Sequence, residues 1–430
     1  MTGKLTIQDW LKISERYEPS CTNWQAPVVW DHGQGAEIWD VEGKHYYDWT
    51  SGVLVTNVGH AHPRLAKAIA QQAERLLNCF DFPTPQRLQL AQKLIELMPP
   101  GLSKVIFMST GGEATDSALR LAKRYSGQYE IISFWGGFHG RTYGPMSVTG
   151  LPKIKKHFGP IIPGAILAPY PYCYRCPFDK NYPDCDLFCL KFLDKVVEVE
   201  STGHLAGLIV EPYQGTAGFV FPPPGYLKAL ETWAKKRNLV FILDEVQSCY
   251  GRTGKMWAME HENLQPDIIC LGKGIGSGAP ISAVVSRPEI FDSLGPGEMS
   301  STMGGNPLCC AAGLAVLEII EEEKLVQKAA ENGQYLKNHL LRLKEKFPFI
   351  GDVRGMGLVY GLEFVKDKKS KDPAPDLAKE IVLKCVANGL MCGKLGLYGN
   401  VMRVAPPLVI TAEQIDKSVA ILEKVLSTFL

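Results

Sequence analysis

The sequence has no long hydrophobic run, no block of charges of one sign and no internal repeat. No apolar stretch in its 430 residues approaches the ~18 that a membrane-spanning helix needs, and its N-terminal segment lacks the apolar core of a secretion signal. Lys and Arg number 46 against 45 Asp and Glu, a formal charge of +1, without the basic excess of a nucleic-acid-binding chain. We therefore expect a cytoplasmic protein that binds neither membrane nor nucleic acid.

Linkers rich in Gly, Ser or Pro are also absent, so domains must be inferred from the pattern of elements. At ~150 residues per domain, the length predicts two or three. We expect a large domain over residues 61–315 and a smaller α+β domain over 316–430. Residues 1–60 form a third segment that packs with the small domain, with a hairpin over 37–48 that turns at Glu42-Gly43.

Short β-rich runs alternate with helical patterns in the first three quarters of the chain. Strands are expected at 105–108, 131–134, 207–210, 239–243, 268–271 and 281–285, and helices at 114–126 and 225–237. This alternation predicts an α/β fold whose mostly parallel sheet is covered on both faces. Farther on, we expect a long helix over 314–343 with one breaker, Gly333, then a strand over 358–364, a helix over 376–388 and a last helix from Ala412.

Three short segments carry polar groups at the ends of predicted strands. In Ser109-Thr-Gly-Gly-Glu-Ala114, small residues open a helix, so backbone N–H groups can approach an anion; a capping box of Thr110 and Glu113 would explain the same residues. Asp244 ends a buried strand, where α/β folds place ligands. Lys273 lies among glycines at another strand end, where burial would lower its pKa and free the amine to react.

A phosphate cradle, an aspartate and a lysine in this order are what pyridoxal 5'-phosphate requires: the aspartate keeps the pyridine nitrogen protonated and the lysine binds the aldehyde. From about Gly35 to the C-terminus, the sequence resembles the class III (ω-amino-acid) aminotransferases of the fold type I pyridoxal phosphate enzymes. The resemblance implies a seven-stranded type of sheet in the large domain, a small-molecule amine and a 2-oxo acid as substrates, and a homodimer or larger homo-oligomer with shared active sites.

The same resemblance assigns roles to residues. Lys273 and Asp244 fall on the catalytic positions, and Thr302 on a threonine that reaches the cofactor phosphate of the neighbouring subunit. The implied cofactor-binding residues are Thr110, Gly111, Gly112, Phe138, His139, Asp244, Val246, Gln247, Lys273 and Thr302. The implied substrate-binding residues, which agree with the 4-aminobutyrate branch of the family, are Val53, Arg141, Glu211 and Arg403. In that branch Arg141 takes the distal carboxylate, and Glu211 masks Arg403 while an ω-amine binds.

Other activities on this scaffold stay open. An amino-acid racemase or epimerase would share every cofactor residue, and Arg141 and the Glu211–Arg403 pair could be structural ion pairs. A decarboxylating transaminase for dialkyl amino acids is similar near the C-terminus, but that branch has glutamine at the position of Val53 and tryptophan at that of Phe138. A catalytically silent binding protein would lack the lysine or the aspartate. The phosphate turn also departs from the family's commoner Asn-Ser-Gly-Ala-Glu-Ala, although a hydroxyl and small residues remain.

Four of the twelve cysteines are clustered outside the family pattern, at Cys173, Cys176, Cys185 and Cys189. A C-x2-C pair followed by C-x3-C in an intracellular chain is consistent with a zinc or iron–sulfur site. Disulfides, or thiols that are only packed, would explain the same residues. In each case we expect the four cysteines to take no part in catalysis.

Overall fold

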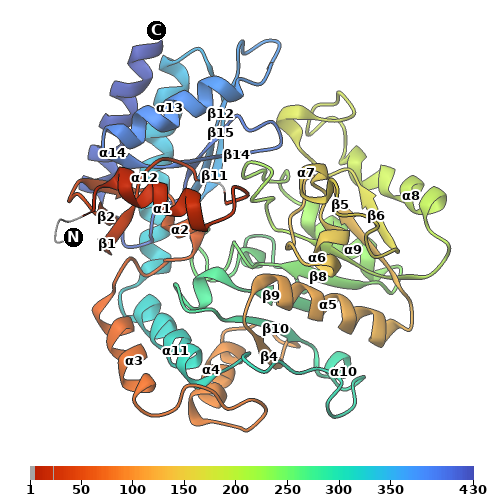
Figure 1. Cartoon of the computed structure of the whole chain (residues 1–430). Helices are drawn as coiled ribbons and strands as arrows, with labels where there is room; N and C mark the ends of the chain where they lie inside the picture. The colour runs from red at the N-terminus through yellow and green to blue at the C-terminus, as the bar shows by residue number, and fades with distance from the viewer. Residues whose placement is uncertain (1–4, 23) are drawn as a thin grey trace.

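The computed structural model describes residues 5–22 and 24–430, and its centre is a seven-stranded sheet in the order β4-β10-β9-β8-β7-β5-β6 (Figure 1). The strands are β4 (Lys104–Met108), β5 (Glu130–Phe134), β6 (Ala165–Ala168), β7 (Leu205–Val210), β8 (Val240–Asp244), β9 (Ile268–Leu271) and β10 (Ser282–Ser286). Only β10 runs antiparallel to its neighbours. The mostly parallel α/β fold and all six predicted strands are confirmed; β6, a four-residue edge strand, was not predicted.

Helices cover this sheet on both faces (Figure 1). They are α5 (Gly111–Ser126), α6 (Tyr143–Val148), α7 (Pro152–Lys155), α8 (Phe188–Glu200), α9 (Tyr226–Lys235) and α10 (Pro288–Phe291), with short 3-10 turns η1 (Cys173–Arg175), η2 (Ala258–His261) and η3 (Lys273–Ile275). Helices α3 (Pro63–Ala73) and α4 (Pro85–Glu96) pack against α11 (Pro307–Glu322) at one end of the sheet. Both helices predicted for this part of the chain, α5 and α9, are confirmed.

The C-terminal part forms an antiparallel sheet in the order β11-β12-β15-β14. Its elements are α12 (Leu325–Lys346), β11 (Ile350–Met356), β12 (Val359–Phe364), α13 (Pro375–Ala387), β14 (Gly393–Leu395), β15 (Val401–Val404), α14 (Ala412–Leu426) and η4 (Ser427–Phe429). The single helix expected over 314–343 is wrong, because the chain breaks at Lys324, whose φ is +53°. Gly333 lies inside α12, where a Cβ would come within 2.1 Å of the Gly357 carbonyl oxygen, so this glycine allows close packing and does not end a helix.

The N-terminal segment forms its own sheet of β1 (Trp30–Gln34), β2 (Glu37–Asp40) and β3 (His45–Asp48), preceded by α1 (Ile7–Tyr17) and followed by the short α2 (Ser51–Leu54). The predicted hairpin is confirmed, with Gly43 at φ +85° in its turn. The fourth strand, β13 (Leu390–Met391), pairs in parallel with β3 and comes from the C-terminal part. The division at 61 and 316 stays a prediction, and its second boundary falls within the continuous helix α11.

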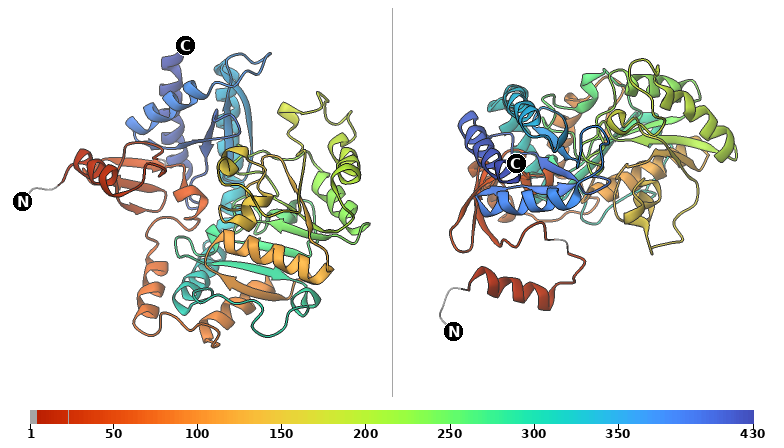
Figure 2. Two further views of the ribbon diagram at one scale, coloured as in Figure 1. Left: turned by 45° about the vertical axis from the view of Figure 1, so that its right-hand side comes forward. Right: turned by 90° about the horizontal axis from the view of Figure 1, so that it is seen from above.

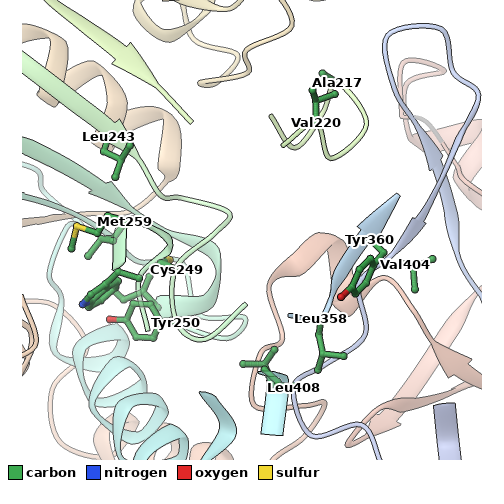
Figure 3. Close-up of a cluster of buried hydrophobic side chains, with 14 of the residues drawn as sticks. Ala217, Val220, Leu243, Cys249, Tyr250, Met259, Leu358, Tyr360, Val404 and Leu408 are labelled. Carbon is green, nitrogen blue, oxygen red and sulfur yellow. The ribbon is translucent and has the colours of Figure 1, made fainter. Parts of the chain in front are cut away.

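Large and small sheets share one buried core. A single cluster of apolar side chains runs from Leu243 on β8 through Tyr250 to Leu358 and Tyr360 beside the small sheet (Figure 3). Tyr250 packs its ring edge-on against Trp257, with ring centroids 5.4 Å apart. The core therefore fixes the carboxyl end of β8 relative to β12 and β15. In the described residues no helix combines the length and the apolar character that crossing a bilayer requires.

Candidate active site

The carboxyl ends of β8 and β9 meet the N-terminus of α5 around a cavity of about 240 Å³. Nine of the predicted site residues line it, and Gly140 and Thr216 complete the wall. The full lining is Gly111, Gly112, Phe138, His139, Gly140, Glu211, Thr216, Asp244, Val246, Gln247 and Lys273. Parallel strands place their carboxyl ends at one edge of a sheet, so residues far apart in the sequence converge there.

One end of the cavity is suited to an anion. Thr110 caps α5 by accepting a hydrogen bond from the Glu113 N–H at 3.2 Å. The N–H groups of Gly111 and Gly112, in the first turn, have no carbonyl partner within the helix. A Cβ on Gly111 would lie 2.7 Å from Cγ1 of Val246, so only glycine fits there. Capping and anion binding are therefore compatible, because they use different N–H groups of the same helix end.

Asp244 is held by two donors at the end of β8. Its Oδ2 lies 2.7 Å from Nδ1 of His139, and its Oδ1 accepts a hydrogen bond from the Val246 N–H at 3.1 Å. Burial disfavours a charged His139, but the hydrogen bond and charge of Asp244, aided by Glu211, prevail and raise the pKa of His139. The two hydrogen bonds orient the carboxylate. This partnership of His139 with Asp244 was not anticipated from the sequence.

Lys273 begins η3 with a left-handed backbone, φ +44°, which is rare for a residue with a side chain. Burial lowers the pKa of its amine, although the carboxylates of Asp244 and Glu211 oppose this shift. A lowered pKa makes more of the neutral, nucleophilic amine present near neutral pH. On the opposite wall, the buried Oε1 of Gln247 has no hydrogen-bond partner among the described residues.

These groups fit pyridoxal phosphate. The α5 N-terminus suits the phosphate, Asp244 suits a protonated ring nitrogen, and Lys273 suits the aldehyde. The unpartnered oxygen of Gln247 suits a ring hydroxyl, because a buried acceptor without a donor is costly. Each requirement of the cofactor is matched by a separate group of this chain.

Glu211 lines the cofactor cavity and Arg403 lines a second cavity, and the two are not paired in the described chain. The carboxylate of Glu211 accepts hydrogen bonds from the N–H groups of Phe138, at 2.8 Å, and Gly215, at 3.1 Å. Burial raises the pKa of Glu211 to about 7. Arg403, on β15, is only 7% exposed, and its Nε and Nη1 have no partner among the described residues. Burial lowers the pKa of Arg403 to about 10, so its charge persists at neutral pH.

Five predicted residues lie outside the lining of the cofactor cavity: Thr110 and Arg403, described above, and Val53, Arg141 and Thr302. Arg141 is exposed, with its guanidinium carbon 6.0 Å from the ring centroid of Phe138. Val53, on α2, is 41% exposed and lines a second cavity together with Arg403. Thr302 is exposed on the loop before α11. Helix α1 also lines the second cavity, a role that the sequence reading missed; the apolar spacing of Trp10, Ile13 and Tyr17 was the available signal.

The four clustered cysteines are not arranged as a metal centre. In residues 5–22 and 24–430, no three potential ligands are grouped to hold an ion, and all twelve cysteines are free thiols. Burial raises the pKa of Cys173, with a further contribution from Cys176 and Cys185, and raises that of Cys189 to about 11. Whether these thiols bind a metal, form disulfides or are only packed stays a prediction.

Comparisons with known proteins agree with this geometry. The family model described as Aminotransferase class-III matches residues 20–426. The chain belongs to this family. It is 40% identical over 406 residues to a leucine/methionine racemase of Thermococcus litoralis (94% of this chain, 91% of the relative). It is 36% identical to a probable 4-aminobutyrate aminotransferase of Bacillus subtilis (98% of each chain). An aminotransferase crystal structure from Bacillus anthracis superposes with a TM-score of 0.92 at 32% identity (98% of each chain).

This class III chain is therefore a pyridoxal phosphate-dependent aminotransferase of fold type I. Its cofactor is pyridoxal 5'-phosphate, and its substrates are an amine and a 2-oxo acid. Residues that were predicted from separate motifs converge on one cavity, as the chemistry of this family requires.

Proposed function

We propose that this aminotransferase moves the amino group of an ω-amino acid of the 4-aminobutyrate type to a 2-oxo acid. The observation that carries the proposal is a pair of arginines, Arg141 and Arg403, with no carboxylate of the described chain within 4.0 Å of either guanidinium. Arg141 is suited to the distal carboxylate of an ω-amino acid, and Arg403 to the carboxylate next to the keto carbon of a 2-oxo acid. The relative named as a probable 4-aminobutyrate aminotransferase supports this choice.

The residues of the cofactor cavity have separate proposed roles in the reaction. When bound, pyridoxal phosphate supplies an aldehyde that carries the amino group and a ring that accepts electron density. We assign Lys273 to covalent attachment of the cofactor and to proton movement at the substrate carbon, because its pKa is lowered and it lies in the cavity. Asp244, fixed by His139, stabilises the proton on the ring nitrogen. Gly111 and Gly112 would hold the phosphate, and Phe138 and Val246, which line the same cavity, would lie against the ring.

Glu211 is the proposed selector between the two substrates. Covering Arg403 while an ω-amine binds would require its carboxylate to leave the Phe138 and Gly215 N–H groups. A pKa of about 7 supports this, since the group is near the point where it can lose or keep its charge. Charged, it pairs with Arg403; neutral, it leaves Arg403 to a substrate carboxylate.

Amino-acid racemisation is a second candidate. It is favoured by the 40% identical relative named as a leucine/methionine racemase and by the unpaired Arg403, which suits an α-amino acid directly. Both candidates use the same cofactor residues. They differ in whether a carbonyl product is released.

The deciding experiment follows both outcomes in one panel. Purified holoenzyme is incubated with 4-aminobutyrate or with L- and D-α-amino acids, with and without 2-oxoglutarate, and keto-acid formation and optical rotation are measured. We expect Arg141→Met to slow the ω-amino-acid half-reaction about ten- to a hundredfold, Arg403→Met to slow the 2-oxo-acid half-reaction, and Lys273→Ala to abolish both. Inversion of α-amino acids without keto acid, unaffected by Arg141→Met, would replace the proposal with racemisation.

Assembly and location complete the proposal. Thr302 is exposed and does not line the cavity of its own chain, which supports its reaching a second chain's cofactor in a two-fold dimer. Twelve free cysteines support the reducing cytoplasm as the compartment.

A further inference from the structure

A second cavity, of about 630 Å³, lies between helix α1, the N-terminal sheet and Arg403. Seen from above, α1 stands apart from the body of the molecule and runs alongside it (Figure 2). The helix is tied to the sheet at its start, where the Ile7 N–H donates to Oε1 of Glu42 at 2.9 Å. It is therefore held over the cavity as a wall.

The wall that α1 presents is apolar. Trp10, Ile13 and Tyr17 fall on one face at helical spacing and line the cavity. None of the helix's residues is buried, and these three side chains remain 41%, 38% and 72% exposed. An apolar face that ends in a cavity gains free energy when an apolar group fills that cavity. Across from α1, Trp24 and Trp30 add aromatic surface.

The lining of this cavity also includes one buried cation. This cation is Arg403, whose Nε and Nη1 have no hydrogen-bond partner among the described residues. Gly393 makes room there, since a Cβ at this position would lie 1.7 Å from Oε1 of Gln25 and 3.5 Å from Nη1 of Arg403. The other charged lining residue, Glu18, accepts a hydrogen bond from Ser14 at the far end of α1. The site thus offers an anion receptor with an apolar chamber beyond it.

We infer that this chamber binds the side chain of the α-amino or 2-oxo acid whose carboxylate is on Arg403, and that Trp10, Ile13 and Trp24 select for bulky apolar side chains. The inference rests on the proposed role of Arg403 and deepens it. It concerns the α-acid half-reaction and leaves the ω-amino donor as proposed. Substrates that carry only a methyl group would leave the wall of α1 uncovered.

A homologous series of substrates tests this selection. With holoenzyme, kcat/KM is measured in the α-acid half-reaction for alanine, 2-aminobutyrate, norvaline and norleucine. We expect a rise of about fourfold per added methylene in the unmodified enzyme. Trp10→Ala and Trp24→Ala should reduce this slope to less than half. Lys12→Ala, on the same helix but outside the cavity lining, should leave it unchanged.

A binding measurement independent of turnover accompanies the series. Propionate, butyrate, valerate and hexanoate carry the carboxylate and chain but no amino group, and their dissociation constants are read from quenching of tryptophan fluorescence. Affinity should rise with chain length and lose that dependence in Ile13→Ala, which keeps the fluorophores. The inference is overturned if neither series depends on chain length, or if Lys12→Ala has the same effect as Trp10→Ala. It is also overturned if Trp10→Ala changes the sedimentation coefficient but not the dependence of kcat/KM on chain length, because the apolar face of α1 would then contact a second chain. If the enzyme transaminates 4-aminobutyrate but kcat/KM does not depend on chain length, only this inference is refuted. If kcat/KM rises with chain length but α-amino acids are inverted without keto-acid formation, only the proposed transamination is refuted.

Discussion

Arg252 is a buried guanidinium that ties together three segments around the proposed substrate residues Val53 and Arg403. Its Nη1 donates to the carbonyls of Pro406, at 2.6 Å, and Leu358, at 3.0 Å, and its Nη2 donates to Oδ1 of Asn57 at 2.8 Å. A longer contact, 3.4 Å, reaches Oγ of Ser51. The residue therefore links the α2 loop, which carries Val53, to the segment that follows Arg403.

Two opposing terms set the effect of replacing Arg252 by methionine. Three acceptors bonded at 3.0 Å or less would be left buried, at about 1–3 kcal/mol each. Against this, burial lowers the pKa of Arg252 to about 10, so keeping the guanidinium charged inside costs about 3 kcal/mol. At the middle of this range the three unbonded acceptors cost about 6 kcal/mol, which exceeds the cost of the buried charge. We therefore expect Arg252→Met to lose about 3 kcal/mol of unfolding free energy.

The assay is urea unfolding of holoenzyme at pH 7, followed by tryptophan fluorescence, with kinetics under native conditions beside it. Arg252→Lys is the matched control, because an ammonium can keep one of the three acceptors and should recover part of the loss. We also expect KM for α-amino acids to rise in Arg252→Met, since the α2 loop is released. A loss below about 0.5 kcal/mol in both variants, with KM unchanged, would show that these hydrogen bonds neither stabilise the fold nor position the loop.

Two further predictions concern the cofactor site. The pKa of His139 is raised in the folded chain, so the charged imidazole stabilises the fold fully below its unfolded pKa of about 6.5, and this stabilisation is lost as pH rises through the folded pKa. The difference in unfolding free energy between the native protein and His139→Gln, measured after cofactor removal, should therefore shrink above about pH 6.5. A difference that does not depend on pH would refute the charged pair with Asp244. If Thr302 serves the neighbouring subunit, mixing inactive Lys273→Ala with impaired Thr302→Ala chains should restore activity at about one quarter of the sites, whereas no recovery after confirmed subunit exchange would place Thr302 in its own site.

The sequence allowed the cofactor site to be predicted because its residues follow strands. A buried run such as 239–243 predicts a strand, and polar residues after it in a parallel sheet must lie at the ligand-binding edge. Asp244 and Lys273 were assigned to one site on this basis, and the structure brings them into one cavity. The break at Lys324 was missed because nothing in Glu321-Glu-Glu-Lys324 disfavours a helix locally, while Gly333 suggested a break that close packing against Gly357 explains instead.

Long-range packing accounts for what the sequence could not provide. The hydrogen bond from His139 to Asp244 joins residues 105 positions apart, and no local pattern specifies it. The missing contact between Glu211 and Arg403 has the same origin. Both residues match family positions, but hydrogen bonds from the Phe138 and Gly215 N–H groups fix where the Glu211 carboxylate lies. The cysteine spacing left metal, disulfides and packed thiols open, and in the described residues no three potential ligands are grouped to hold an ion.

The cofactor cavity and the second cavity, which we infer to hold the substrate side chain, are built from different parts of the chain. The cofactor cavity is built from segments between Gly111 and Lys273, each attached to a strand of a single sheet. The second cavity joins α1 at one end of the sequence to Arg403 near the other, through the parallel pairing of β13 with β3. Side chains on the two termini can change without disturbing the large sheet, because they contribute nothing to its hydrogen bonding. If the second cavity selects the substrate side chain as we infer, this selection can vary among relatives that keep the same cofactor residues, and racemase and aminotransferase names do occur at similar identity to this chain.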